Sequence, residues 1–197
     1  MKKNQISAIG QFLAYYENDL RYILNFQKFK AGKIQAEDYV KKEEGSFYKF
    51  VIEFKIVRNF PKGTAIDILN KTKDWINSKQ ADDVDLFAQN LKIEGYTRGD
   101  SRSLASKILF LNNPWEIIPM DRLTRATLGV KNNNYDDYLY KLKAFESKNQ
   151  KHIQSMVDYI KPLIDIIHKN YQDLNDLNII AKNRMIDKLL WSGEIQF

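Results

Sequence analysis

The sequence contains no cysteine and only two histidines among its 197 residues. Without cysteine the chain forms no disulfide, zinc–thiolate site or iron–sulfur cluster, and thiol catalysis is excluded. His152 and His168 are the only histidines, and their separation along the chain does not indicate a metal site or a catalytic triad. We therefore expect neither a metal nor a cofactor, and a fold that its hydrophobic core stabilises unaided.

Long apolar runs are also missing. None reaches the ~18 residues needed to cross a bilayer. The N-terminus begins with lysines as a signal peptide does, but Glu17 and Asp19 interrupt its apolar stretch and no small-residue cleavage site follows. The sequence also lacks a phosphate-binding Gly-x-x-x-x-Gly-Lys loop and a Gly-x-Ser-x-Gly nucleophile motif. We expect a cytoplasmic monomer with no membrane partner.

Positive charge is in excess. The formal net charge is +6 and the isoelectric point is about 9.2. Such a balance favours a polyanionic partner, nucleic acid first, although a lysine-rich surface also serves solubility alone. Hydrophobic residues make up 44% of the chain and charged residues 28%, which is typical of a globular protein.

Apolar residues recur at helical spacing through most of the chain, and no alternating segment has an evident partner strand. We predict one all-α domain of about nine helices in two lobes, with a core at residues 46–129 and a C-terminal lobe at 130–197 that packs with 1–45. The main expected helices are 6–28, 46–58, 64–77, one capped by Asp82 or Asp83, one that begins near Ser101, one that begins at Asp121, one opened by Asp136 and Asp137, 151–171 with a bend at Pro162, and 187–191. Residues 36–44 also fit a short, weakly amphipathic helix.

Residues 46–58 are open to two interpretations. Phe47, Phe50 and Val51 follow a helix face, and Ser46 is a suitable N-cap residue. The alternation around Glu53 and Lys55 also fits a strand, since this stretch is rich in β-branched residues. We favour the helix. As a strand, Glu53-Phe54-Lys55 with the upstream Asp38 would resemble a metal-dependent nuclease of the PD-(D/E)xK type.

The stretch from Ser101 to Gly129 organises the candidate site. It predicts a helix, a loop that contains Pro114 and Pro119, and a second helix with Asp121 as its N-cap. A carboxylate in that position faces the positive end of the helix dipole, which favours its ionised form. Basic residues surround it in sequence: Arg102, Lys107, Arg122 and Arg125. The plainer interpretations are an ordinary cap and a solvated basic face.

This region has a glycine-bearing hairpin, followed by SRSLASKIL, a loop and PMDRLTRATL. In this order of segments it resembles the helix-hairpin-helix DNA glycosylase superfamily. Members carry Pro-x-Asp before a helix and a basic residue one turn later, here Pro119, Asp121 and Arg125. The resemblance covers about residues 46–129. It is greatest to the bacterial 8-oxoguanine glycosylase-like branch, whose members tend to end with a helix like the one that carries Arg184, Asp187 and Trp191.

The resemblance implies that the chain binds double-stranded DNA, flips a damaged or modified base and hydrolyses its N-glycosidic bond. Asp121 would stabilise the positive charge that develops on the sugar. Trp115 would lie near the base. The residues implied to contact DNA are Gly95, Tyr96, Arg98, Gly99, Arg102, Ser103, Arg122 and Arg125.

The chain departs from the family pattern at two places. The hairpin Gly95–Gly99 is longer and more charged than the usual Gly-apolar-Gly turn. The lysine nucleophile of the bifunctional branch aligns with Ser103, which implies a monofunctional enzyme, with Lys107 on about the same helix face as a bifunctional option. A non-catalytic helical module that binds nucleic acid or protein is the alternative function, and the nuclease is a third.

Overall fold

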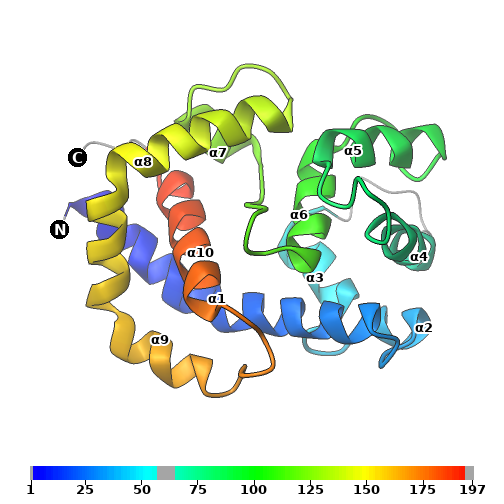
Figure 1. The fold of residues 1–197 in the computed structure, drawn as a ribbon, viewed down its shortest axis with the longest axis horizontal. Helices are drawn as coiled ribbons and strands as arrows, with labels where there is room; N and C mark the ends of the chain where they lie inside the picture. The colour runs from blue at the N-terminus through cyan, green and yellow to red at the C-terminus, as the bar shows by residue number, and fades with distance from the viewer. Residues whose placement is uncertain (1, 57–64, 194–197) are drawn as a thin grey trace. The chain divides into compact units, whose positions relative to one another are not determined.

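A computed structural model describes residues 2–56 and 65–193. Within these ranges all regular secondary structure is helical, and the ten helices α1 to α10 confirm the predicted all-α fold (Figure 1). None of the described helices has the length and apolar character required to cross a membrane. The predicted helix start at Thr64 lies outside the described residues.

The chain divides into two units. Residues 21–117 form a central unit, and residues 1–20 together with 118–197 form a terminal unit. Helix α1, Lys3–Lys30, supplies its first part to the terminal unit and the remainder to the central unit. The predicted core of residues 46–129 is thus distributed over both units.

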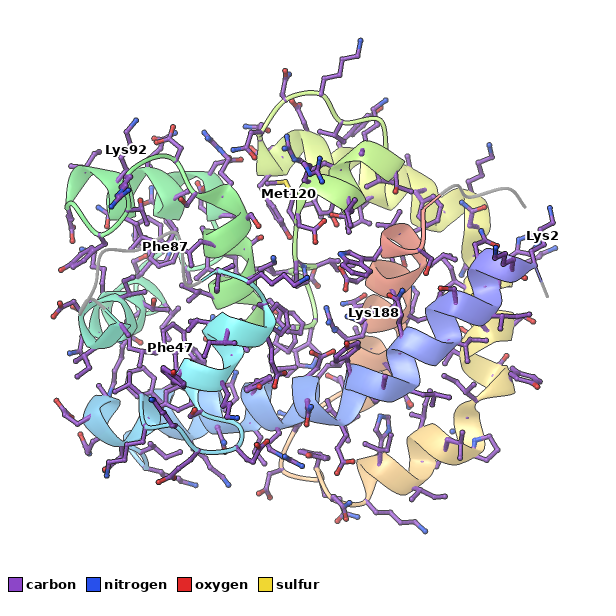
Figure 2. All side chains as sticks on the ribbon, turned by 180° about the vertical axis from the view of Figure 1, so that it is seen from behind. Lys2, Phe47, Phe87, Lys92, Met120 and Lys188 are labelled. Atoms are coloured by element: carbon purple, nitrogen blue, oxygen red, sulfur yellow. The ribbon has the colours of Figure 1, made fainter. Side chains whose placement is uncertain are left out.

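The central unit is built around aromatic side chains. Its elements are the second part of α1, α2 (Ala36–Tyr39), α3 (Phe47–Glu53), α4 (Ala65–Trp75), α5 (Val84–Ile93) and α6 (Arg102–Asn112). The rings of Phe47 and Phe50 stack at 6.0 Å, and Phe50 also contacts Tyr22 from α1. Phe47 and Phe87, both fully buried, are labelled in Figure 2. Burial of these large rings is the main stabilising contribution to this unit.

Residues 46–58 begin as a helix, as predicted. The side chain of Ser46 accepts a hydrogen bond from the Lys49 amide, so it is the N-cap of α3. The helix ends earlier than expected, at Glu53, and Lys55 adopts a left-handed conformation with φ of 55°. The strand that the nuclease alternative requires at Glu53-Phe54-Lys55 therefore does not form.

The terminal unit contains the first part of α1, α7 (Arg122–Thr127), α8 (Tyr135–Tyr159), α9 (Lys161–His168) and α10 (Leu177–Trp191). Helix α10 packs against both α7 and α8. Two predictions here were wrong in their boundaries: α8 continues to Tyr159, where a new helix was expected from 151, and α10 is 15 residues long where only 187–191 was expected. Helix α8 ends before Ile160, so Pro162 lies in the first turn of α9. A proline sacrifices no helical hydrogen bond there, although it lacks an N–H.

Side chains cap the starts of several helices. Asp83 accepts from the Leu86 amide and caps α5, as predicted. Asn134 caps α8 by accepting from the Asp137 amide. Asp136 and Asp137 lie in the first turn of α8, as predicted, where their charge complements the helix dipole.

Candidate functional site

Asp121 is the N-cap of α7, as the sequence predicts. Its Oδ1 accepts hydrogen bonds from the amides of Leu123 at 2.8 Å and Thr124 at 2.9 Å. The Thr124 hydroxyl accepts in return from the Asp121 amide at 3.0 Å, which completes a capping box. The residue is half-buried. The carboxylate is thus held at the helix start and still reaches solvent.

Two tyrosines from α8 fix the loop that leads to Asp121. The Tyr135 hydroxyl accepts from the Ile118 amide and donates to the Ile118 carbonyl, both at 3.1 Å. The fully buried Tyr138 donates to the Pro119 carbonyl at 3.2 Å. Burial, followed by the charge of Asp187, raises the pKa of Tyr138 well above its ordinary value, so its hydroxyl remains a donor at physiological pH. The backbone ahead of the acid therefore has little freedom.

Trp191, in the last turn of α10, makes the second contact to the carboxylate. Its indole Nε1–H donates to Asp121 Oδ2 at 3.0 Å, although seventy positions separate the two residues. Trp191 is 41% exposed. A second hydrogen bond joins the same two helices, from the Thr127 hydroxyl to the Leu190 carbonyl at 2.8 Å.

A buried ion-pair cluster anchors α10 to the first part of α1. Arg184 is 1% exposed; its Nε donates to Asp19 Oδ2 at 2.7 Å and its Nη1 to Asp187 Oδ2 at 3.1 Å. Burial by itself lowers the pKa of the Arg184 guanidinium, but the two carboxylates outweigh it and the net pKa is raised. Lys188 lies 3.6 Å from Asp187 Oδ2 and adds the charge that makes the cluster neutral.

The hairpin between α5 and α6 carries most of the predicted phosphate contacts. Gly95 has φ of +80°, which a residue with a side chain rarely adopts. Its amide donates to the Lys92 carbonyl, and the amides of Tyr96 and Thr97 both donate to the Leu91 carbonyl. These amides therefore cap the end of α5. The Thr97 hydroxyl donates to the Gly99 carbonyl and closes the loop.

The start of α6 has a different character. Its N-cap residue, Ser101, makes no side-chain hydrogen bond to the helix. In the part of the chain that the structure describes, the amides of Ser103 and Leu104 have no acceptor. Leu104 is fully buried, so the first turn of this 11-residue helix leaves the amide of the half-buried Ser103 as a donor that a phosphate oxygen can accept from.

The two hairpin arginines are in unlike environments. The side chain of Arg102 is 15% exposed, and its guanidinium is ion-paired with Asp85 and Asp100. Arg98 is exposed and makes no ion pair with any of the described residues. Of these two arginines, Arg98 is therefore the one whose charge is available to a polyanion.

Lys107 and Trp115 also lie in the central unit. Lys107 is only 9% exposed, and its ammonium donates to the Phe54 carbonyl at 3.1 Å, where α3 ends. The contact satisfies a carbonyl at a helix end and complements its dipole. Trp115 is half-buried in the loop after α6.

Arg122 and Arg125 belong to α7 in the terminal unit. Arg122, directly after Asp121, is exposed. Arg125 donates to the Asn132 carbonyl at 3.0 Å and so supports the loop between α7 and α8. Of the predicted site residues, the terminal unit brings these two arginines together with Asp121, and the central unit holds the rest.

The sequence analysis did not predict the roles of several residues at the terminal-unit site. Tyr135 and Tyr138 hold the loop before the acid, and Asp19 anchors α10. The spacing of Arg184, Asp187 and Trp191 was the available signal, because positions i, i+3 and i+7 lie on one helix face. Over residues 2–56 and 65–193, no group of three or more His, Asp or Glu side chains is arranged to hold a metal ion.

Comparison with models of protein families finds no match, and no curated protein or solved structure is significantly similar to the chain.

Proposed function

We propose that the chain is a DNA glycosylase that flips a damaged or modified base out of the duplex and hydrolyses its N-glycosidic bond, with Asp121 as the catalytic carboxylate. The observation that carries the proposal is how the Asp121 side chain is held and how far it is exposed. Three N–H donors hold it, two from the start of α7 and one from Trp191, while the residue stays partly exposed.

Such a carboxylate suits a reaction that creates positive charge. Cleavage of an N-glycosidic bond proceeds through an oxocarbenium-like sugar, as in other glycoside cleavages. A fixed negative charge beside the sugar C1′ stabilises that state without having to reorganise during the reaction. A water molecule then adds to C1′, and its proton leaves to the carboxylate or to solvent. The base departs with the electron pair of the broken C–N bond.

The start of α6 and Arg98 support a contact with the DNA backbone. The first turn of α6 offers the amide of Ser103 to a phosphate, and the exposed guanidinium of Arg98 adds a positive charge in the preceding hairpin. The overall charge of +6 acts in the same direction.

We further propose that the enzyme is monofunctional. A lysine that opens the abasic sugar through a Schiff base must present a neutral amine to C1′. The ammonium of Lys107 instead donates to the Phe54 carbonyl and is nearly buried, which supports a structural role. Lys107→Met is expected to lower stability, whereas a β-elimination product that disappears in this variant would assign Lys107 to catalysis.

A panel of duplexes, each with one modified base, tests the function. Incubation with the protein should convert one of them to an abasic site, which alkali then cleaves. Asp121→Asn keeps a good N-cap residue and removes the charge, so base release is expected to fall by roughly 10² or more. Asp83→Asn, the same change at the N-cap of α5, is the matched control and should leave base release unchanged.

The alternative function makes a different prediction in the same experiment. A non-catalytic helical module would bind duplex with a steep salt dependence and release no base from any member of the panel. Wild-type and Asp121→Asn proteins would then bind equally well. Base release that Asp121→Asn does not reduce would also rule out the proposed role of Asp121.

A further inference from the structure

Donors from the described residues leave one acceptor site of the Asp121 carboxylate open. A carboxylate has about four lone-pair sites, two on each oxygen. The amides of Leu123 and Thr124 occupy both sites of Oδ1, and the indole of Trp191 occupies one site of Oδ2. The remaining site is on Oδ2. Any further group that the carboxylate orients, whether water or sugar, must meet this oxygen.

The indole reaches Oδ2 because α10 is anchored one and two turns before it. Arg184, Asp187, Lys188 and Trp191 follow the i, i+3, i+4, i+7 spacing that places side chains on one helix face. On that face, Arg184 binds Asp19 in the interior, and Lys188 lies 5.2 Å from the ring centre of Tyr15. Figure 2 labels Lys188 and also Met120, which directly precedes Asp121.

We propose that Trp191 is a positioning residue, whose indole N–H sets the orientation of the Asp121 carboxylate and directs the one unoccupied site of Oδ2 toward the reacting sugar or water. This inference rests on the proposed function for its role in catalysis, but the contact itself is independent of it. The two helix amides hold Oδ1, and the indole adds a donor on the other oxygen. Rotation about the Cβ–Cγ bond would therefore break hydrogen bonds at both oxygens.

The contact is measured directly by the indole N–H resonances in an NMR spectrum of the ¹⁵N-labelled protein. The chain has three tryptophans, so three indole signals are expected, and Trp→Phe variants assign them. Asp121→Ser retains an N-cap but its side chain is too short to reach the indole. The Trp191 signal should shift in Asp121→Ser, while the signals of Trp75 and Trp115 stay in place. A Trp191 signal that does not move overturns the proposal.

Single-turnover base release measures the catalytic consequence. Trp191→Phe keeps an aromatic ring and removes the donor, so the rate at saturating enzyme should fall roughly 10- to 100-fold, the value of a hydrogen bond to a charged group. Duplex affinity should stay the same. Trp191→His, which restores an N–H on a ring, should recover part of the rate. An unchanged rate in Trp191→Phe overturns the positioning role.

Trp75→Phe is the matched control for loss of an indole N–H. The Trp75 Nε1 is buried without a hydrogen-bond partner among the described residues, and its ring packs against Phe87. This variant should release base at the wild-type rate. If the wild type releases no base from any duplex, the proposed function fails, and the NMR result alone decides whether Trp191 holds Asp121.

Discussion

The guanidinium Nε of Arg184 lies 2.7 Å from Oδ2 of Asp19, and 165 positions of sequence separate the two residues. Both side chains are almost wholly removed from solvent, at 1% and 4% exposure. The pair joins the last helix of the chain to the first within the terminal unit. Each buried charge is stabilised by the other instead of by water. Removal of either charge alone therefore lowers the free energy of unfolding.

Arg184→Met is therefore expected to destabilise the protein by about 3–5 kcal/mol, since it removes the cation that pairs with the buried Asp19 and leaves Asp187 with Lys188 alone. Urea unfolding followed by circular dichroism measures the loss. Lys161→Met is the control, because Lys161 pairs with Asp165 at 2.8 Å on the surface and should cost less than about 1 kcal/mol. The double variant Asp19→Asn/Arg184→Met should regain part of the stability. A loss no larger than that of Lys161→Met would contradict the anchoring role.

His168 makes the stability of the terminal unit depend on pH. Its Nε2 lies 2.8 Å from the hydroxyl of the buried Tyr16, and burial lowers the pKa of His168, against a smaller opposing effect of Asp165. An unfolded histidine titrates near pH 6.5. As the pH falls through this value, the unfolded chain gains a proton that the folded chain does not, so stability is lost on acidification.

The loss is measured as the change in Tm between pH 7.5 and pH 5.5. In His168→Gln this change should be smaller than in the wild type by roughly 1–3 °C, because the variant has no proton to bind. His152→Gln removes the other histidine, which is exposed, and should leave the wild-type change unaltered. Equal changes in all three proteins would show that His168 does not contribute.

Gly45 is expected to tolerate alanine poorly. Its φ is +72°, and a Cβ at this position would lie 2.5 Å from Asn25 Nδ2, the group that donates to the Gly45 carbonyl. Gly32 has nearly the same φ, +73°, but open space around it. Both alanine variants incur the left-handed strain, about 1 kcal/mol, and Gly45→Ala should cost about 1 kcal/mol more through the displaced hydrogen bond. Equal midpoints of thermal unfolding for the two variants would refute this.

Arg98 and Arg102 should respond differently to substitution. Arg98→Gln removes an exposed charge. The slope of the logarithm of the duplex-binding constant against the logarithm of the salt concentration should therefore decrease in magnitude by about one, with little change in stability. Arg102→Gln removes the cation that is ion-paired with Asp85, whose side chain is only 13% exposed, and should lower the unfolding midpoint. Fluorescence anisotropy over a salt series and thermal unfolding separate the two effects. A salt slope that Arg98→Gln leaves unchanged would remove Arg98 from the proposed interface.

The sequence predicts well what depends on neighbours along the chain. The cap at Asp121 was identified because the acid directly precedes the apolar positions Leu123, Ala126 and Leu128, and Ser46 identified the start of α3 in the same way. The helix start expected at Lys151 was wrong, because α8 continues to Tyr159, whereas the bend expected at Pro162 lies close to the boundary between α8 and α9. In the structure α8 ends at Tyr159, and Ile160 separates it from the first turn of α9, which contains Pro162.

By itself the sequence determined an all-helical chain, the position of the candidate acid and the excess of positive charge, because apolar periodicity, capping and composition are local properties. Only the tertiary structure decided that Trp191 binds Asp121 and that Arg184 binds Asp19. It also decided that Arg102 pairs with Asp85 and that Lys107 donates to the Phe54 carbonyl, both within the central unit. These contacts join residues that are distant in sequence, and such pairs leave no periodic pattern from which to predict them.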